Sequence, residues 1–202
     1  MDVLQLGLIP YKEAFEKQLE LVEKRIKGEI PDTLLLLEHP PVITLGRSAK
    51  KENILNSKKA EIIEVNRGGD VTCHFPGQIV GYPILDLSKR GKDIHKYMRD
   101  IEEVLINFLA GYGITGTRVE GKTGVFVGHD KIASIGVAAK QWTSYHGFAI
   151  NIKKDISVFD TIIPCGLQGV KATSVEILLK KNIEMKDAYE GITEEFKEVF
   201  QN

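Results

Sequence analysis

Three segments of the chain repeat apolar residues every three to four positions, a spacing that places them on one face of an α-helix. These expected helices run over Tyr11–Lys27, Asp93–Ala110 and Met185–Phe200. Gly28 and Gly111 stand where a glycine commonly ends a helix. Thr173 and Glu176 have the spacing of a capping box, which predicts a shorter helix to about Lys181.

Shorter apolar runs, bounded by Gly, Pro and polar clusters, predict β-strands. They cover residues 3–9, Leu34–Leu37, Val42–Leu45, Glu61–Asn66, Val71–Phe75, Gln78–Leu87, Ile114–Val119, Gly124–Val127, Lys131–Ala138 and Ser144–Ile152. The alternating residues 3–9 indicate an edge strand, whereas the continuous Leu34–Leu37 run indicates a strand buried on both faces. The Pro76-Gly77 pair predicts a turn that joins the strands on either side of it into a hairpin.

The predicted strands gather in the middle of the chain and most are joined by hairpins, while the helices flank them. This order predicts an α+β fold with a mixed, largely antiparallel central sheet. The 202 residues are enough for one well-packed domain, so we expect residues 1–202 to form a single domain.

Composition narrows the classes of function. With 43% hydrophobic residues, 27% charged residues and a formal net charge of −1, the chain lacks the basic excess of most nucleic-acid binders. Neither a signal peptide nor an apolar run of about 20 residues is evident, so we expect a cytoplasmic protein with no membrane partner. No metal-ligand spacing and no phosphate-binding loop is found.

The richest candidate site is the stretch from Arg67 to Leu87. It contains a glycine pair followed by Asp70, Cys73, His74 and Gln78, and a purely structural hairpin would need none of these polar groups. Neighbouring strand residues point to opposite faces, so Cys73 and His74 cannot both line a site. We expect His74 to face the site and Cys73 to pack behind it.

Two further residues could carry chemistry. Cys165 lies between Pro164 and Gly166 in a segment that lacks any helix or strand pattern, which suits a nucleophile, although a half-buried inert thiol fits the pattern as well. Lys131 opens an apolar strand, where its amine could lower the pKa of a thiol or move protons. The alternative for Lys131 is an ordinary solvated lysine. We expect His39 and His146 to be structural or surface residues.

Three segments together resemble the lipoyl(octanoyl) transferases, whose fold is shared with lipoate- and biotin-protein ligases. They are RGGDVTCHFPGQIVGYPILDL at 67–87, DKIASIGVAAKQWTSYHGFAINI at 130–152 and FDTIIPCGLQGVKATSV at 159–175, and EHPPVITLGR at 38–47 adds to the likeness. The resemblance implies a biotin/lipoate protein ligase-like fold. It also implies transfer of octanoyl from octanoyl-acyl carrier protein, through a Cys165 thioester, to a lysine ε-amine on a lipoyl domain.

The same resemblance implies roles for individual residues. Cys165 would be the nucleophile and Lys131 its partner, in a reaction that needs no ATP, cofactor or metal. The substrate-contacting set would be Arg67, Gly68, Gly69, Asp70, Val71, Thr72, Cys73, His74, Ser134, Ile135, Gly136, Gly147, Phe148 and Ala149. Acceptors would be lipoyl domains of 2-oxoacid dehydrogenase complexes and the glycine cleavage H protein.

The chain departs from the family's usual TYHGPGQ, because it has Cys73 for the tyrosine and Phe75 for the glycine. These changes leave the preferred acyl-chain length open. Two alternative functions stay open as well. One is an ATP-dependent lipoate or biotin ligase, which the Pro164-Cys165-Gly166 sequence disfavours. The other is a non-catalytic module that binds acyl-carrier or lipoyl domains.

Overall fold

The computed structural model describes residues 1–56, 60–163 and 170–201. Its strands are β1 (Asp2–Leu8), β2 (Thr33–Glu38), β3 (Val42–Leu45), β4 (Glu61–Glu64), β5 (Val71–His74), β6 (Gln78–Ile84), β7 (Thr117–Val119), β8 (Lys122–Val127), β9 (Asp130–Lys140) and β10 (Thr143–Asn151). Its helices are α1 (Tyr11–Ile26), α2 (Ile94–Gly111), α3 (Val175–Leu179) and α4 (Met185–Gln201), with 3₁₀ turns η1 (Lys51–Asn53), η2 (Leu87–Arg90) and η3 (Ser157–Thr161).

The described strands form two sheets. The large sheet has seven strands in the order β1-β2-β6-β10-β9-β8-β7, and the small sheet has three in the order β4-β3-β5. In the large sheet β1 pairs with β2 in parallel and the other neighbours are antiparallel. The predicted mixed, largely antiparallel sheet is therefore confirmed, and so is the edge position of β1.

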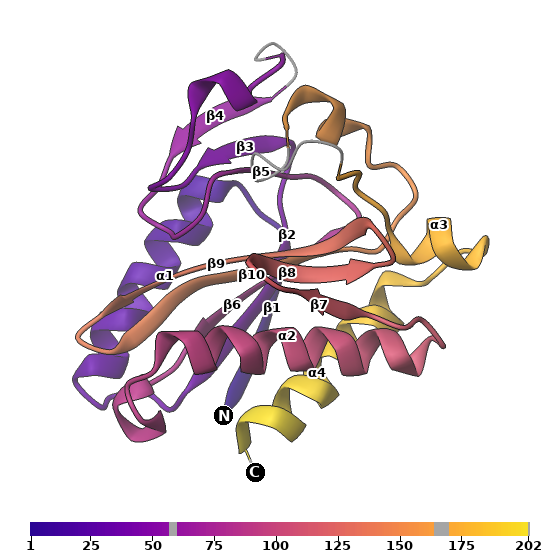
Figure 1. Cartoon of the computed structure of the whole chain (residues 1–202). Helices are drawn as coiled ribbons and strands as arrows, with labels where there is room; N and C mark the ends of the chain where they lie inside the picture. Colours follow the sequence, from indigo (N-terminus) through magenta and orange to yellow (C-terminus); the bar gives the residue numbers. More distant parts are fainter. Residues whose placement is uncertain (57–59, 164–169, 202) are drawn as a thin grey trace.

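Strand β2 separates two hydrophobic cores. Leu34 and Leu36 pack in the core under α2 and α4, while Leu35 and Leu37 pack in the core under α1. All four side chains are fully buried, as the continuous apolar run predicted. Figure 1 shows α2 and α4 against one face of the large sheet and the small sheet beyond the other face.

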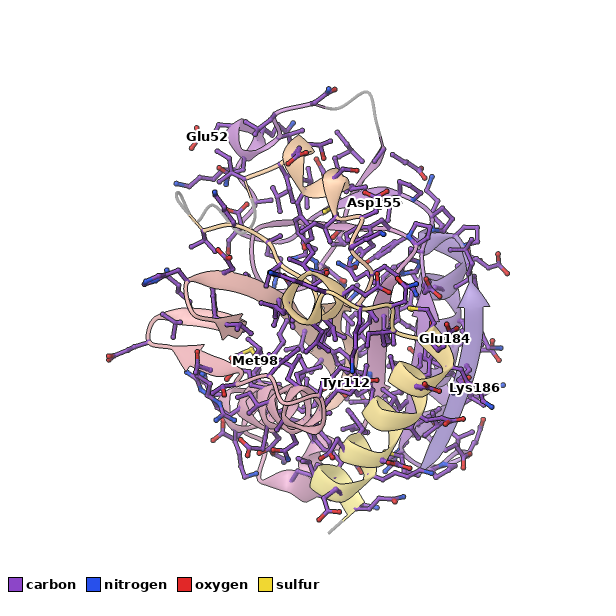
Figure 2. The ribbon with its side chains drawn as sticks, turned by 90° about the vertical axis from the view of Figure 1, so that its right-hand side faces the viewer. Glu52, Met98, Tyr112, Asp155, Glu184 and Lys186 are labelled. Atoms are coloured by element: carbon purple, nitrogen blue, oxygen red, sulfur yellow. The ribbon has the colours of Figure 1, made fainter. Side chains whose placement is uncertain are left out.

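The small sheet has its own core, which includes Ile43, Val71, Cys73, Phe75 and Ile162. In Figure 2, Glu52 and Asp155 mark the end of the molecule that carries this sheet, and Glu184 and Lys186 mark the distant part around α4. Within the described residues, no helix combines the length and the apolar character that crossing a membrane requires.

The predicted hairpin around Pro76-Gly77 is wrong. Strand β5 pairs with β3 in the small sheet, whereas β6 pairs with β2 and β10 in the large sheet. The turn between them is held from the large sheet, because the carbonyl oxygen of Gly77 accepts hydrogen bonds from the backbone N–H groups of Ile152 and Lys153. Gly77 has a φ of +93°, which favours glycine. The turn thus carries the chain from one sheet to the other.

The predicted capping box is also wrong. Ser174, not Thr173, caps α3, and its hydroxyl accepts a hydrogen bond from the backbone N–H of Ile177. The Glu176 carboxylate is buried and accepts hydrogen bonds from the backbone N–H groups of Lys154 and Ile183. Glu176 therefore ties three segments together instead of closing a cap.

The second helix ends one residue later than predicted, and its C′ glycine is displaced by two residues. Gly111 is still helical, and the left-handed glycine is Gly113, with a φ of +73°. A Cβ added at Gly111 meets no atom within 4 Å.

We therefore expect Gly111→Ala to raise the free energy of unfolding by about 0.5–1 kcal/mol, because alanine in a helix loses less backbone entropy than glycine. Gly113→Ala is the matched control and should destabilise the protein, since its backbone is left-handed. Urea unfolding of both variants measures the two effects. A destabilising Gly111→Ala would instead place the helix end at Gly111.

Candidate active site

A small pocket lies between the two sheets, with about 40 Å³ of free space for the centres of water-sized molecules. It is lined by Tyr11, Arg67, Gly69, Asp70, Thr72, His74, Tyr82, Ser134, Ile135, Gly136, His146, Gly147, Phe148 and Ala149. These residues come from α1, β5, β6, β9, β10 and the segment before β5. The crossing of the chain at Pro76-Gly77 is what lets β5 and β6 form opposite parts of the wall.

Small residues on β9 and β10 leave space for the pocket. Ser134 pairs across the strands with Ala149, and Gly136 pairs with Gly147. A Cβ at Gly136 would lie 2.8 Å from the backbone oxygen of Gly68. Glycine at 136 therefore lets the segment before β5 come close to the large sheet.

Arg67 organises that segment. Its guanidinium donates to the carbonyl oxygens of Thr44 (2.8 Å), Asp70 (2.9 Å) and Gly68 (3.0 Å), and also to the Thr44 hydroxyl. The backbone N–H of Gly68 in turn donates to the carbonyl oxygen of Val137 on β9. Arg67 lines the pocket while it holds the loop in one shape.

Asp70 joins the same segment to its neighbours. Its carboxylate accepts hydrogen bonds from the backbone N–H groups of Val71 (2.7 Å) and Lys50 (3.1 Å) and from the side-chain amide of Asn53 (2.8 Å). The Thr72 hydroxyl is different, because it is buried in the pocket wall without a hydrogen-bond partner among the described residues. It can donate to, or accept from, a polar atom of a ligand.

A chain of directed hydrogen bonds fixes the His74 ring. The carbonyl oxygen of Thr173 accepts from Asn151 Nδ2 (2.9 Å), and Asn151 Oδ1 accepts from Gln78 Nε2 (2.9 Å). Gln78 Oε1 therefore accepts from His74 Nδ1, 2.8 Å away. Because Nδ1 carries the proton, the neutral ring keeps an acceptor lone pair on Nε2. Burial lowers the pKa of His74 well below its ordinary value, so the ring is neutral.

His74 lines the pocket and Cys73 packs in the core of the small sheet, the arrangement that the strand alternation predicted. Val71 packs in the same core. Neither Val71, Cys73 nor Gly68 is among the residues that line the pocket. The other eleven residues of the expected substrate-contacting set do line it. The side chains of Val71 and Cys73 point away from the pocket, because alternate strand residues face opposite sides of the sheet.

Three pocket residues were not predicted, namely Tyr11, Tyr82 and His146. His146 was expected to be structural or at the surface, but it is 1% exposed and its ring forms part of the pocket wall. Its φ of +53° is left-handed, which is uncommon for a residue other than glycine inside a strand. Gln18 compensates by accepting a hydrogen bond from the His146 backbone N–H (2.8 Å).

His39 lies behind the pocket wall and is likewise buried, not at the surface. Its Nδ1 donates to the carbonyl oxygen of Ile9 (2.7 Å), and its Nε2 therefore accepts from the Tyr82 hydroxyl (2.8 Å). No spacing in the sequence connects Tyr11, Tyr82 and the two histidines, since they lie on four separate elements or loops.

Lys131 is buried, with 5% of the residue exposed, so the alternative of a solvated lysine is wrong. Its amine donates to the carbonyl oxygen of Thr123 (3.0 Å) and lies 5.6 Å from the centroid of the Phe126 ring. The backbone of Lys131 is bound on both sides, by the carbonyl oxygen of Lys171 and the N–H of Thr173. Cys165 lies outside the described residues, but the described chain resumes after it alongside Lys131. Within that described part, no group of three or more His, Cys, Asp or Glu side chains is placed to hold a metal ion.

Comparison with known structures defines the class of protein. A lipoate-protein ligase A bound with ATP superimposes with a TM-score of 0.73 at 16% identity, covering 99% of this chain and 85% of that one. A biotin protein ligase from Aquifex aeolicus gives a TM-score of 0.55 at 12% identity, covering 100% and 69%. The fold is that of the lipoate and biotin protein ligases, as the resemblance implied.

Sequence comparison defines the family. Residues 10–197 match the lipoyl protein ligase A/B catalytic domain. An octanoyltransferase from Rubrobacter xylanophilus is 50% identical, over 98% of this chain and 93% of its own length. Another from Syntrophotalea carbinolica is 45% identical, over 100% and 95%. The chain belongs to the octanoyltransferases of this family.

The buried histidines predict a pH dependence of stability. Burial lowers the pKa of His39 to about 4 and, with the nearby Arg67 charge, that of His146 to about 3. An unfolded histidine binds its proton near pH 6.5, so the unfolded state binds more protons below that pH and the free energy of unfolding falls as the pH falls. Above about pH 7 this contribution to stability is complete.

We expect His39→Gln to reduce the slope of unfolding free energy against pH between about 4.5 and 6, by up to roughly 1.4 kcal/mol per pH unit. Urea unfolding across this range measures the slope. His129→Gln, at the exposed turn before β9, is the matched control for loss of an imidazole. A slope that responds equally to both substitutions would contradict a buried neutral His39.

Proposed function

We propose that the protein transfers octanoyl from octanoyl-acyl carrier protein, through a thioester on Cys165, to the ε-amine of a lysine on a lipoyl domain. The observation that carries the proposal is a pocket lined in part by β9, the strand that also bears the buried Lys131. Ser134 in the pocket lies three residues from Lys131, about 10 Å along a strand. The pocket and the amine thus lie along one stretch of β9.

The chemistry has two balanced steps. The Cys165 thiolate attacks the thioester carbonyl carbon, and the bond to the carrier's sulfur breaks as that sulfur takes up a proton. The lysine amine of the acceptor then attacks the acyl-enzyme, loses a proton, and releases the Cys165 thiol as the amide forms. A thioester is exchanged for a thioester before the amide makes the transfer favourable, so the proposed reaction draws on no ATP, metal or cofactor.

Lys131 has two roles in this proposal. Its cation stabilises the Cys165 thiolate, and its amine moves the protons that the two steps take up and release. The Thr123 carbonyl oxygen and the Phe126 ring hold the amine in place, and Gly124 makes room for it, since a Cβ there would lie 2.8 Å from Lys131 Cε.

The pocket wall supplies the proposed acyl site. We assign the contacts to Arg67, Gly69, Asp70, Thr72, His74, Ser134, Ile135, Gly136, Gly147, Phe148 and Ala149. Each methylene that is buried on binding contributes about 0.8 kcal/mol. The proposed setting is the cytoplasm, with residues 1–202 acting as one catalytic domain. The proposed acceptors are the lipoyl domains of 2-oxoacid dehydrogenase complexes and the glycine cleavage H protein.

The decisive experiment is the intact mass of the protein after mixing with octanoyl-acyl carrier protein in the absence of ATP. Wild type and Cys73→Ala should gain one octanoyl group, whereas Cys165→Ala should gain none. Cys73 is the matched control because it is the chain's other cysteine and packs away from the pocket. Acylation of a lipoyl domain only with ATP and free acid would instead establish a ligase. Binding of both carriers with no transfer would establish a non-catalytic module.

Lys131→Ala should slow octanoyl transfer by at least about 100-fold, the usual scale of lost proton-transfer catalysis. In the Cys73→Ala background, alkylation by iodoacetamide reports on Cys165 alone. Adding Lys131→Ala should raise the pH midpoint of this alkylation, because the Cys165 thiolate loses a neighbouring cation. Lys122→Ala is the matched control, since the Lys122 amine also lies over Phe126, at 5.8 Å. An alkylation profile that Lys131→Ala leaves unchanged would remove the electrostatic role.

A further inference from the structure

The pocket has an open end and a closed end. Gly69 is exposed and Asp70, Ser134 and Gly136 are half-buried, so the opening lies over β9. At the other end three aromatic rings close the pocket, those of Tyr11, Tyr82 and His146, which are 5%, 3% and 1% exposed. We call these three residues the ring wall.

The pocket depth follows from the order of the strands. Between the opening over β9 and Tyr82 on β6 lies one strand, β10. Two strand spacings of about 4.8 Å give a depth of roughly 10 Å. An extended chain of eight carbons, with C–C bonds of about 1.5 Å, spans roughly 9 Å. Tyr82 therefore stands about one eight-carbon chain from the opening, and the rings of His146 and Tyr11 close the pocket beside it.

Hydrogen bonds hold the ring wall rigid and occupy its polar atoms. The Tyr82 hydroxyl donates to His39 (2.8 Å), and His146 Nε2 donates to Asn66 Oδ1 (2.8 Å). The remaining nitrogen of His146 accepts from the Tyr11 hydroxyl at 3.4 Å. With these atoms bound to one another, the wall presents mainly ring carbons to the pocket. Such a wall suits a terminal methyl group and cannot shift as a methionine side chain would.

His146 has a left-handed backbone conformation, which is evidence that its position in the pocket has a function. A left-handed residue of this kind costs about 1–3 kcal/mol and persists where the surroundings demand it. The ring stacks on Phe15 with centroids 5.3 Å apart, and Gln18 binds the backbone N–H. The local backbone of β10 thus departs from extended geometry at His146, and the imidazole of this residue closes the pocket.

A second hollow lies next to a residue that binds the ring wall. Asn66, which binds the His146 ring, also lines a second hollow of about 460 Å³ together with Tyr145 and Val137. Val137 is the cross-strand partner of His146. Asn66 therefore lies between the His146 ring and this hollow.

The two residues that depart from the family's usual sequence do not form the wall. Cys73 and Phe75 pack in the core of the small sheet, and Phe75 faces the Phe159 ring at 5.6 Å. The pocket shape at its closed end is therefore independent of these two substitutions.

We propose that Tyr11, Tyr82 and His146 form a stop that sets the longest acyl chain the pocket accepts, at about eight carbons. The proposal rests on the acyl transfer proposed above. It assigns chain-length selection to residues from three separate elements, and it makes them specificity determinants, not participants in the chemistry.

The test is competition among acyl-carrier thioesters of six, eight, ten and twelve carbons, read as the mass of the acyl-enzyme. His146→Gly removes the ring, and glycine tolerates the left-handed backbone. We expect the decanoyl-to-octanoyl ratio to rise about tenfold or more in His146→Gly and in Tyr11→Leu, because two further methylenes become buried. Ala149→Val narrows the pocket and should shift the preference toward hexanoyl by a similar factor.

Phe75→Leu is the matched control, since it removes a buried ring outside the pocket, and it should leave the ratios within about twofold of wild type. If the acyl-chain ratios of His146→Gly, Tyr11→Leu and Ala149→Val all equal those of wild type, the proposed stop is overturned. If the ring variants fail to fold, Ala149→Val alone decides, and an unchanged ratio there overturns it.

Failure of the proposed function gives a different result. Wild type would then take up no acyl group at any length. In that case the stop is tested with free fatty acids of the same lengths. The measurement is the rise in the protein's melting temperature when each acid binds. Octanoate that stabilises wild type more than decanoate, with the order reversed in His146→Gly, supports the stop. The same order in both proteins overturns it.

Discussion

The site depends on how the small sheet is held against the large one. Pro76-Gly77 carries the chain between them, and the Gly77 carbonyl oxygen is bound by two N–H groups that follow β10. A second tie joins Gly68 to Val137 through their backbones. The ties hold the sheets together at two places while small residues on β9 and β10 keep a space between them. A pocket with walls on two sheets is rigid because neither wall can move without breaking a buried hydrogen bond.

The elements with strong local patterns could be predicted from the sequence. Four consecutive leucines require burial on both faces, and the alternation at Cys73 and His74 places the histidine in the pocket. The sheet that a strand joins is a different matter. The residues around Pro76-Gly77 suit a hairpin as well as a crossing, and only the distant partners β3 and β10 decide between them. Pairing over long sequence separations leaves no mark in a local pattern.

The ring wall was missed for the same kind of reason. Tyr11 is an ordinary first residue of an amphipathic helix, and Tyr82 is an ordinary strand residue. The left-handed backbone of His146 depends on Gln18, which lies 128 positions away in the sequence. The resemblance was enough to name Lys131 as a candidate. Its burial between Thr123 and Phe126 could not be predicted, because most lysines that open a strand are solvated.

A rigid wall also makes selection by length asymmetric. A chain shorter than the pocket still binds and loses only about 0.8 kcal/mol for each missing methylene, which is less than a tenfold effect. In the proposed site a longer chain would have to displace hydrogen-bonded rings or leave part of itself outside the pocket, and an unsatisfied buried polar group costs more than the roughly 0.8 kcal/mol that one methylene contributes. Apolar contacts alone discriminate poorly between homologous chains. A wall whose polar atoms are bound to one another therefore excludes long chains more sharply than the pocket sides reject short ones.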